Sequence, residues 1–284
     1  MRKRSLIACA ATAALFLSAV LSGCAKEGAE VAFLIYDSDD TFIAETMAAI
    51  EANASFGVPI KIRDAENSQA VQNQQIVELL DSGADLLVVN AVDRLACSAI
   101  VEKCAAEGAG VIFFNREPAG DALAGEKVHY VGAAADSLGK KQADMVAGLF
   151  GSFLGGTYDK NADGVIQLVI IKGEQGHQDA EKRTEHCVSR LQELGYSAEV
   201  LAVEVADWVR REGAGAMERL YGRFGEEIEL VFSNNDDMAL GAIDYLLEEN
   251  IFSPRSAGEY RQPFVLVGVD GTGVGLEAIE SGLL

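Results

Sequence analysis

The chain has 284 residues, and 44 Asp and Glu against 23 Lys and Arg give it a formal net charge of −21. Such an acidic surface repels nucleic acid and anionic membrane surfaces alike, and nucleic acid is excluded as a partner. Because 49% of the residues are hydrophobic, the chain is predicted to be a folded protein with an acidic exterior rather than a disordered one.

The first residues predict export. Arg2, Lys3 and Arg4 precede an apolar run at residues 6–21, and small residues follow it, as in a secretory signal. Cys24 comes directly after Leu-Ser-Gly, which resembles a bacterial lipoprotein signal in which that thiol is acylated. We expect residues 1–23 to be removed and Cys24 to anchor the protein at the outer face of the cytoplasmic membrane, or in the periplasm. The alternative is an ordinary transmembrane anchor, for which the apolar run is short.

The remaining sequence alternates strand and helix. Strands are predicted at residues 31–36, 60–65, 85–90, 110–115, 128–133, 166–172, 198–205, 229–234 and 264–270. Helices are predicted at residues 41–54, 69–80, 95–106, 137–154, 180–194, 208–224, 238–249 and 275–281. Continuous apolar strands separated by helices indicate an α/β fold of parallel sheets flanked by helices on both faces.

These strands are too many for one compact sheet, so two lobes are predicted. The weak signals at residues 118–127 place the boundary there, giving an N-terminal lobe at 24–120 and a C-terminal lobe at 121–284. The segment at residues 251–262 is predicted to be a surface loop. Cys97, Cys104 and Cys187 are expected to be free, buried and inert, since no CxxC motif or Cys/His cluster indicates zinc.

One loop spaces oxygen ligands as a calcium loop does. Positions 1, 3, 5 and 9 carry side-chain oxygens, position 6 is glycine, and position 7 can offer its carbonyl: Asp159, Asn161, Asp163, Gln167, Gly164 and Val165. Position 12, where an EF-hand has glutamate, is Ile170, and the following residues indicate a strand rather than a helix. The spacing alone leaves a solvated Asp/Asn/Gly turn as the alternative.

Polar residues follow six of the predicted strands. They are the segments 36–40, 89–90, 115–117, 172–177, 234–236 and 268–270. In parallel sheets, ligands bind beyond the carboxyl ends of the strands. Together, these hydrogen-bonding groups, with almost no nucleophile among them, favour binding of a neutral polyhydroxylated molecule. Each residue alone is more typical of a helix cap than of a ligand contact.

Several segments resemble the periplasmic D-galactose/D-glucose-binding proteins, which are type I solute-binding proteins of ABC importers. From Val31 to the last residue, the segments that carry the likeness are IYDSDDTF, VVNAVD, FFNREP, DKNADGVIQ, IKGEQGHQDAEKRT, ADW, SNNDDMALGA and VGVD. The resemblance implies a monomer with a two-lobed fold and a ligand cleft between the lobes.

The resemblance also implies the sugar-binding residues. On the N-terminal lobe they are Tyr36, Asp40, Phe42 and Asn90, and on the C-terminal lobe His177, Asp179, Arg183, Trp208, Asn235 and Asp270. Phe42 and Trp208 would sandwich a pyranose ring, because its C–H faces are weakly apolar. Carboxylates would accept from sugar hydroxyls, while Arg183 and Asn235 would donate to sugar oxygens.

The family's calcium site adds a distant glutamate to the loop. The implied Ca²⁺ ligands are Asp159, Asn161, Asp163, the carbonyl of Val165, Gln167 and Glu229. Glu229 would replace the missing position-12 glutamate, and the ion would have a structural role away from the sugar. The chain also departs from the family: it stops at Leu284, where the family continues with a strand, an inter-lobe crossing and helices. We expect the sequence to be incomplete.

The function implied is a receptor that binds D-galactose or D-glucose and delivers it to an ABC sugar permease, and that is not an enzyme. The alternative is a sugar sensor that signals to a chemotaxis or kinase receptor. A sugar-responsive transcription regulator would need a DNA-binding headpiece, and the export signal argues against it. A sugar hydrolase could use Asp40 and Asp179 as an acid/base pair, or His177 as a general base, but the same residues suffice as sugar contacts.

Overall fold

A computed structural model describes residues 30–53, 60–151, 159–254 and 260–284. The predicted signal at residues 1–23 and the predicted lipid-bearing Cys24 lie outside these ranges. Within them, every helix falls short of the length and apolarity that a bilayer span requires.

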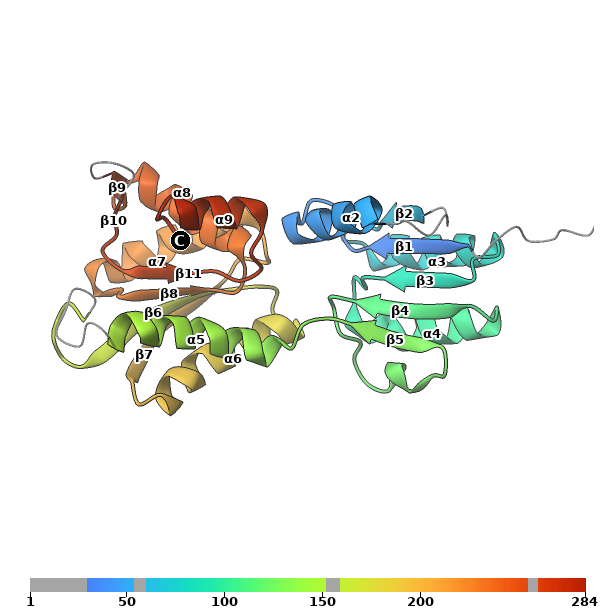
Figure 1. Ribbon diagram of the computed structural model, residues 1–284, viewed down its shortest axis with the longest axis horizontal. Helices are drawn as coiled ribbons and strands as arrows, with labels where there is room; N and C mark the ends of the chain where they lie inside the picture. The colour runs from blue at the N-terminus through green and yellow to red at the C-terminus, as the bar shows by residue number, and fades with distance from the viewer. Residues whose placement is uncertain (1–29, 54–59, 152–158, 255–259) are drawn as a thin grey trace, which may run out of the picture.

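The first lobe is built on a five-stranded parallel sheet in the order β2-β1-β3-β4-β5 (Figure 1). Its strands are β1 (Val31–Ile35), β2 (Ile60–Asp64), β3 (Leu86–Val89), β4 (Gly110–Phe114) and β5 (Val128–Val131). Its helices are α2 (Thr41–Asn53), α3 (Gln69–Asp81) and α4 (Cys97–Ala106), with short 3₁₀ turns η1 (Arg94–Ala96) and η2 (Ala122–Ala124). Ile76 of α3 and Ile100 of α4 share one apolar cluster with Leu87 of β3, while Ile43 and Met47 place α2 in a separate cluster.

The second lobe holds a parallel sheet of four strands in the order β11-β8-β6-β7. The strands are β6 (Val165–Lys172), β7 (Ser197–Val205), β8 (Leu230–Ser233) and β11 (Val265–Val267). The helices are α5 (Ala135–Gly151), α6 (Gln178–Glu193), α7 (Arg210–Phe224), α8 (Asp236–Glu248) and α9 (Gly273–Glu280), with a 3₁₀ turn η3 (Gly225–Glu227). In β6, Leu168 and Ile170 pack with α5 and α6, whereas Val169 and Ile171 pack with α7 and α8. Both faces of β6 are therefore buried, which is why its residues other than Gln167 and Lys172 are apolar.

The predicted lobe boundary between residues 120 and 121 is wrong. Strand β5 pairs with β4, with Val128 beside Val111 and Val131 beside Phe114, so the first lobe continues through Val131. The sequence signal is weak here because β5 has only 4 residues and one of its faces is exposed. The chain crosses to the second lobe between β5 and α5 (Figure 1).

The predicted surface loop at residues 251–262 contains a short antiparallel hairpin of β9 (Ser253–Pro254) and β10 (Tyr260–Arg261).

Cys97, Cys104 and Cys187 are free and buried, as predicted. Burial raises the pKa of Cys97 to about 12 and that of Cys104 to about 11, so both thiols stay protonated at neutral pH.

Candidate functional site

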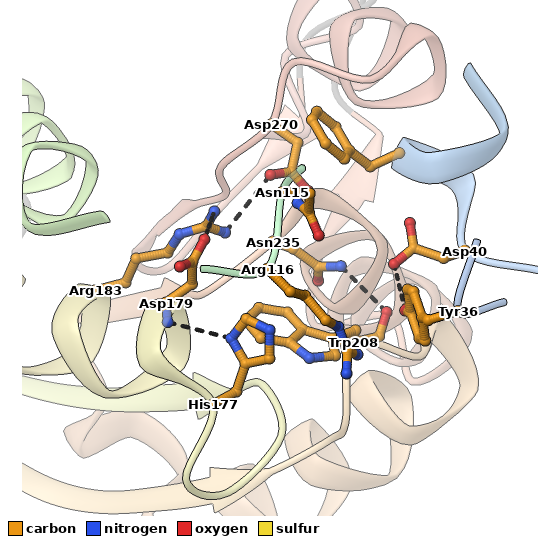
Figure 2. A pocket seen from close by; sticks show the side chains of 11 residues that line it. Tyr36, Asp40, Asn115, Arg116, His177, Asp179, Arg183, Trp208, Asn235 and Asp270 are labelled. Carbon is orange, nitrogen blue, oxygen red and sulfur yellow. Dashed lines mark hydrogen bonds and ion pairs between the residues drawn. The ribbon is translucent and has the colours of Figure 1, made fainter. Parts of the chain in front are cut away.

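The polar carboxyl ends of strands from both sheets meet at one cleft between the lobes (Figure 2). It is lined by 11 residues: Tyr36, Asp40, Phe42, Asn115, Arg116, His177, Asp179, Arg183, Trp208, Asn235 and Asp270. Strands β1 and β4 of the first sheet, and β6, β8 and β11 of the second, lead directly into these residues. This is the place where open parallel sheets bind ligands, so it is the candidate functional site.

Asn90 is the one predicted sugar contact that does not line the cleft. Its side chain is fully buried, and its amide donates to the carbonyl of Phe114 at 3.1 Å and to Oδ1 of Asn115 at 3.0 Å. Its own Oδ1 accepts from the backbone N–H of Tyr36 at 3.3 Å. Asn90 therefore joins the ends of β1 and β4 beneath the cleft surface. The other nine predicted residues lie in the lining.

Asn115 and Arg116 line the cleft but are absent from the set of predicted contacts. Both follow β4 in the FFNREP segment, whose polar character marks a strand end without indicating which side chains face the cleft. Asn115 has a φ of 60°, a left-handed conformation that asparagine tolerates better than most residues and that turns the chain at the strand end. Their sequence signal is their place as the first two residues after the buried strand β4.

The first-lobe wall is an ordered hydrogen-bonded unit. The Tyr36 hydroxyl donates to Oδ2 of Asp40 at 2.5 Å, and Oδ1 of Asp40 accepts from the N–H of Ile43 in the first turn of α2 at 3.0 Å. The Arg116 guanidinium carbon lies 3.8 Å from the Tyr36 ring centroid, and Nη1 donates to the carbonyl of Val92 at 2.8 Å. Burial, followed by the charge of Asp40, raises the pKa of Tyr36 well above its usual value, so its hydroxyl stays a donor.

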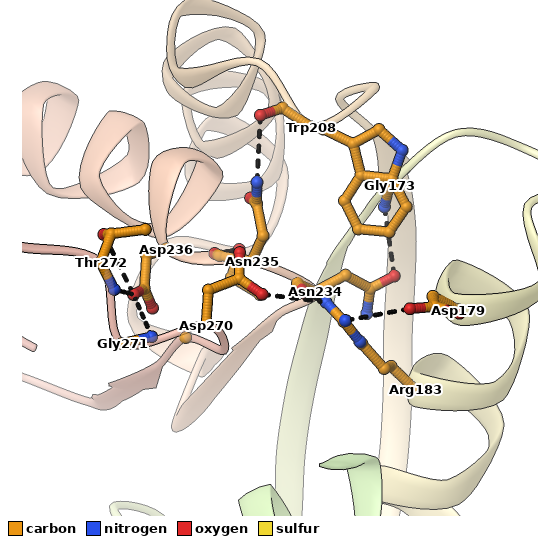
Figure 3. A network of polar contacts seen from close by, with 12 residues as sticks. Gly173, Asp179, Arg183, Trp208, Asn234, Asn235, Asp236, Asp270, Gly271 and Thr272 are labelled. Atoms are coloured by element: carbon orange, nitrogen blue, oxygen red, sulfur yellow. Dashed lines mark hydrogen bonds and ion pairs between the residues drawn. The ribbon is translucent and has the colours of Figure 1, made fainter. Parts of the chain in front are cut away.

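The second-lobe wall is a charge network centred on Arg183 (Figure 3). Its Nη2 lies 3.1 Å from Oδ2 of Asp179, one turn earlier on α6, and its Nη1 lies 3.5 Å from Oδ1 of Asp270. Nη1 also donates to the carbonyl of Asn234 at 2.6 Å. The buried Nε has no hydrogen-bond partner within the described part of the chain, so it could donate to a ligand. Burial raises the pKa of Asp270 to about 8, which is partly opposed by the Arg183 charge.

His177 is neutral in this site. It caps the N-terminus of α6, where its Nδ1 accepts from the N–H of Asp179 at 3.2 Å. Burial, followed by the charges of Arg116, Arg94 and Arg183, lowers the pKa of His177 to about 3. Since Nδ1 is an acceptor, the proton resides on Nε2, which is then a hydrogen-bond donor.

Trp208 is held in a strained position over a glycine. Its φ of 71° is incompatible with a right-handed helix, so α7 begins at Arg210 rather than at the predicted residue 208. A Cβ at Gly173 would lie 2.3 Å from Cη2 of Trp208, so only glycine fits beneath the indole. The ring meets His177 edge-on with centroids 5.1 Å apart, and the Trp208 carbonyl accepts from Nδ2 of Asn235 at 3.1 Å. Such strain is typical of binding sites.

Polar contacts join the two lobes at the rim of the cleft. Nη2 of Arg116 pairs with Oε2 of Glu174 at 3.2 Å, and the Glu45 carboxylate accepts from the N–H of Gly273, at the start of α9, at 2.9 Å. The cleft itself encloses about 30 Å³, which is room for about two water molecules by the same measure. A larger ligand therefore enters only when the lobes separate and these contacts break.

We expect Glu174→Gln to weaken ligand binding about two- to fivefold, because a half-exposed ion pair of up to about 1 kcal/mol would no longer favour the closed arrangement. Equilibrium titration at low and high salt measures this effect, and the difference from the unsubstituted protein should shrink as salt increases. Glu193→Gln, which removes an exposed partner of Arg190 on α6, is the control. An unchanged affinity in Glu174→Gln would show that the pair does not contribute to closure.

The predicted calcium loop forms a compact turn at the start of β6. Asp159 Oδ2 accepts from the N–H of Gly164 at 3.1 Å, and Asp163 Oδ1 accepts from the N–H of Val165 at 2.7 Å. Glu229 is buried, and its two oxygens accept from the N–H groups of Lys160 and Gln167 at 2.5 and 3.1 Å. Burial raises the pKa of Glu229, and nearby Asp159 adds to this shift.

The atoms of this loop that could coordinate a metal are of the chemical type that a hard cation binds. All are oxygens, and the buried Oε1 of Gln167 has no hydrogen-bond partner within the described ranges. Across those same ranges, no three Asp, Glu, His or Cys side chains form a group that could hold a metal ion. Calcium thus stays a prediction.

Two α/β lobes around a cleft lined by fixed donors, acceptors and aromatic rings define a solute-binding protein. The sequence matches the periplasmic binding protein domain over residues 31–284, and the chain belongs to this family. Like its relatives, it is a binding protein and not an enzyme.

Individual relatives differ in the ligand that their names state. The chain is 33% identical over 251 residues to the D-galactose/methyl-galactoside binding periplasmic protein MglB of Haemophilus influenzae, covering 86% of this chain and 74% of the relative. It is 30% identical over 230 residues to a putative rhizopine-binding protein of Rhizobium meliloti, covering 80% and 67%. A solute-binding protein of Bacillus halodurans with bound myo-inositol has a TM-score of 0.74 at 26% identity, covering 92% of this chain and 83% of that one.

Proposed function

We propose that this protein binds D-galactose or D-glucose in the cleft between its lobes and delivers the sugar to an ABC-type permease. The observation that carries the proposal is the composition of the lining. Side chains from both lobes present acceptors, donors and the aromatic rings of Tyr36, Phe42 and Trp208 to one small space. The similarity to the galactoside-binding relative supports a hexose as the ligand.

Each part of the lining has a role in this proposal. Asp40 and Asp179 accept hydrogen bonds from sugar hydroxyls, while the Arg183 Nε and neutral His177 Nε2 donate to sugar oxygens. Trp208 covers one C–H face of the pyranose ring. Because both lobes contact the sugar at once, binding stabilises an arrangement in which the lobes close around the sugar, with the cleft wider than the present one of about 30 Å³.

Calorimetric titration with a panel of neutral sugars and polyols tests the proposal. D-galactose, D-glucose, D-ribose and myo-inositol present hydroxyls on rings of different size and stereochemistry, so they separate the ligand classes named for the relatives. Tightest binding of galactose or glucose would support the proposal. Tighter binding of ribose or inositol would show that the same cleft serves another ligand.

We also propose that the loop at residues 159–167 binds Ca²⁺ with Glu229 and that the ion stabilises the second lobe. Ca²⁺ added to chelator-treated protein at about a hundred times its Kd should add about 2.7 kcal/mol and raise Tm by about 5 to 10 °C. Asp163→Asn should abolish most of this increase, whereas Asp244→Asn, an exposed carboxylate on α8, should leave it intact. Equal Tm values with and without Ca²⁺ would contradict the site.

Export and lipid anchoring through Cys24 belong to the same proposal. The lipoprotein-like sequence around Cys24 supports them, and a receptor tethered beside its permease would capture sugar at the membrane. A Cys24→Ala variant should then be found in the soluble fraction of cells, whereas the unsubstituted protein should sediment with membranes. Equal distribution of the two would contradict the anchor.

A further inference from the structure

A buried glutamine behind the cleft joins two strands that lead into it. Gln142, on α5, is 3% exposed and does not line the cleft. Its Nε2 donates to the carbonyl of Ser233, the last residue of β8, at 2.8 Å, and to that of Gly268, directly after β11, at 3.1 Å. Asn235 and Asp270, which line the cleft, lie two residues beyond these carbonyls. Gln142 therefore holds the backbone just before each of them.

This bridge extends the connection between β8 and β11 beyond their last pair. The register of the two strands ends with Phe232 beside Val267. Ser233 and Gly268 stand one position further, and the Gln142 amide joins their carbonyls there. The carbonyl of Val267, at 3.5 Å from Nε2, is a longer third contact. A side chain from α5 thus takes the place of strand pairing at the edge of the cleft.

The depth of the glutamine is fixed by the packing of α5 on α6. Gly139 lies one turn before Gln142, on the same face of α5. A Cβ at Gly139 would lie 2.7 Å from the carbonyl of Arg183, so the two helices approach closely at this point. The close approach leaves the Gln142 side chain little freedom to withdraw from the strand ends.

Asp270 needs support because its backbone is strained. Its φ of 117° lies in the left-handed region, which side-chain-bearing residues rarely adopt and which persists only where the surroundings fix it. On the far side of Asp270, Oδ2 of Asp236 accepts from the N–H of Gly271 at 2.8 Å and from that of Thr272 at 2.9 Å (Figure 3). Gln142 fixes the near side. The backbone that carries the Asp270 carboxylate is therefore held at both ends.

The other cleft residue near the bridge, Asn235, is fixed by bonds of its own. Its Oδ1 accepts from the N–H of Met238 at 2.9 Å, and its Nδ2 donates to the carbonyl of Trp208 at 3.1 Å. The Asp270 carboxylate, by contrast, meets Arg183 at 3.5 Å, which is longer than a hydrogen bond of good geometry. The direction of the Asp270 side chain therefore depends more strongly on the position of its backbone.

We propose that Gln142 is a positioning residue for sugar binding: it holds Gly268 so that the Asp270 carboxylate points into the cleft toward the sugar. This inference rests on the proposed function, in which carboxylates of the cleft accept hydrogen bonds from sugar hydroxyls. Groups that contact a ligand must be held within about 0.5 Å of the productive geometry by the side chains behind them. Gln142 extends the binding site to α5, the helix that follows the crossing between the lobes.

Gln142→Met tests this role, because methionine is similar in volume and has no donor. In calorimetric titrations with D-galactose and D-glucose, the sugar that binds more tightly should lose about three- to tenfold in affinity, the range of one ordinary hydrogen bond. Gln192→Met makes the same change at an exposed position on α6 and should alter affinity less than about twofold. Gln142→Asn, one methylene too short to bridge both carbonyls, should reproduce the loss, and it replaces Gln142→Met if the methionine variant does not fold.

A cycle of double variants separates positioning from a general effect on the fold. If Gln142 acts through Asp270, Gln142→Met should weaken binding less than about twofold in an Asp270→Asn background. In a Trp208→Phe background it should weaken binding by the same factor as in the unsubstituted protein. Equal losses in all three backgrounds, or no loss at all, would refute the positioning role while the proposed function stands. If neither sugar binds the unsubstituted protein, both fall.

Discussion

Trp208→Ala should lower the affinity for the sugar by roughly 30- to 900-fold. The indole is the largest aromatic side chain in the cleft, and central aromatic anchors of binding sites contribute about 2 to 4 kcal/mol. Gly173 leaves room beneath the ring, and the strained φ of 71° at Trp208 fixes the direction in which it points. Isothermal calorimetry measures the effect, because the variant lacks the only tryptophan.

Trp208→Phe is the matched control for this substitution. It keeps an aromatic face over the cleft and should bind the sugar within about tenfold of the unsubstituted protein, since most of the stacking area remains. Both variants should unfold near the same Tm, because Trp208 packs at the edge of the second-lobe core rather than within it. Retained affinity in Trp208→Ala would contradict the assignment of this cleft to the sugar.

Asp270→Asn should stabilise the free protein against unfolding above pH 4 and weaken sugar binding. Burial raises the pKa of Asp270 from 3.8 to about 8, so the fold favours its neutral form. Its stabilising contribution is complete below pH 4 and is lost as the pH rises toward 8. The loss amounts to a few kcal/mol, since one pKa unit corresponds to about 1.4 kcal/mol.

Denaturant unfolding at pH 5, 7 and 9 measures this prediction. Stability of the unsubstituted protein should fall across this series more steeply than that of Asp270→Asn. The other charges around Asp270, namely Arg183, Asp236, Asp40 and Asp237, remain in the variant and cancel in the comparison. Asp244→Asn, at an exposed site, should keep the steeper fall. Identical pH dependence in Asp270→Asn would show that Asp270 is not buried in its neutral form.

The sugar affinity of the unsubstituted protein should also change with pH, and Asp270→Asn should remove that change. A sugar hydroxyl that donates to Asp270 favours the ionised carboxylate, so binding releases a proton and affinity rises as the pH approaches 8. Asp270→Asn should bind about tenfold more weakly at pH 8 and lose this dependence, because a charged acceptor is replaced by a neutral one.

The fold could be predicted wherever burial of an element produces a regular pattern of apolar residues in the sequence. Strand β6 is buried on both faces, so its eight residues are nearly all apolar and its position follows from the sequence. Strand β5 lies at the sheet edge with exposed residues, and its pairing with β4 could not be inferred from its four residues. For that reason the predicted lobe boundary lies before β5, whereas the structure places it after β5.

The site could be predicted to the extent that its residues follow strand ends. The resemblance identified nine lining residues, but Asn90 and Arg116 show its limit. Both stand near the ends of adjacent strands, and only their side-chain directions separate them. Asn90 turns beneath the surface to bond Asn115, whereas Arg116 turns outward onto Tyr36. Side-chain direction at a strand end depends on tertiary contacts, which spacing does not encode.

The most direct test of the central claim, that this cleft binds a hexose, is a titration of the purified protein with D-galactose and D-glucose, monitored by intrinsic fluorescence. Trp208 is the only tryptophan and lines the cleft, so its emission responds to a ligand bound there. The account predicts a saturable change in emission with at least one of the two sugars. Folded protein whose emission and calorimetric heat are unchanged by either sugar would contradict it.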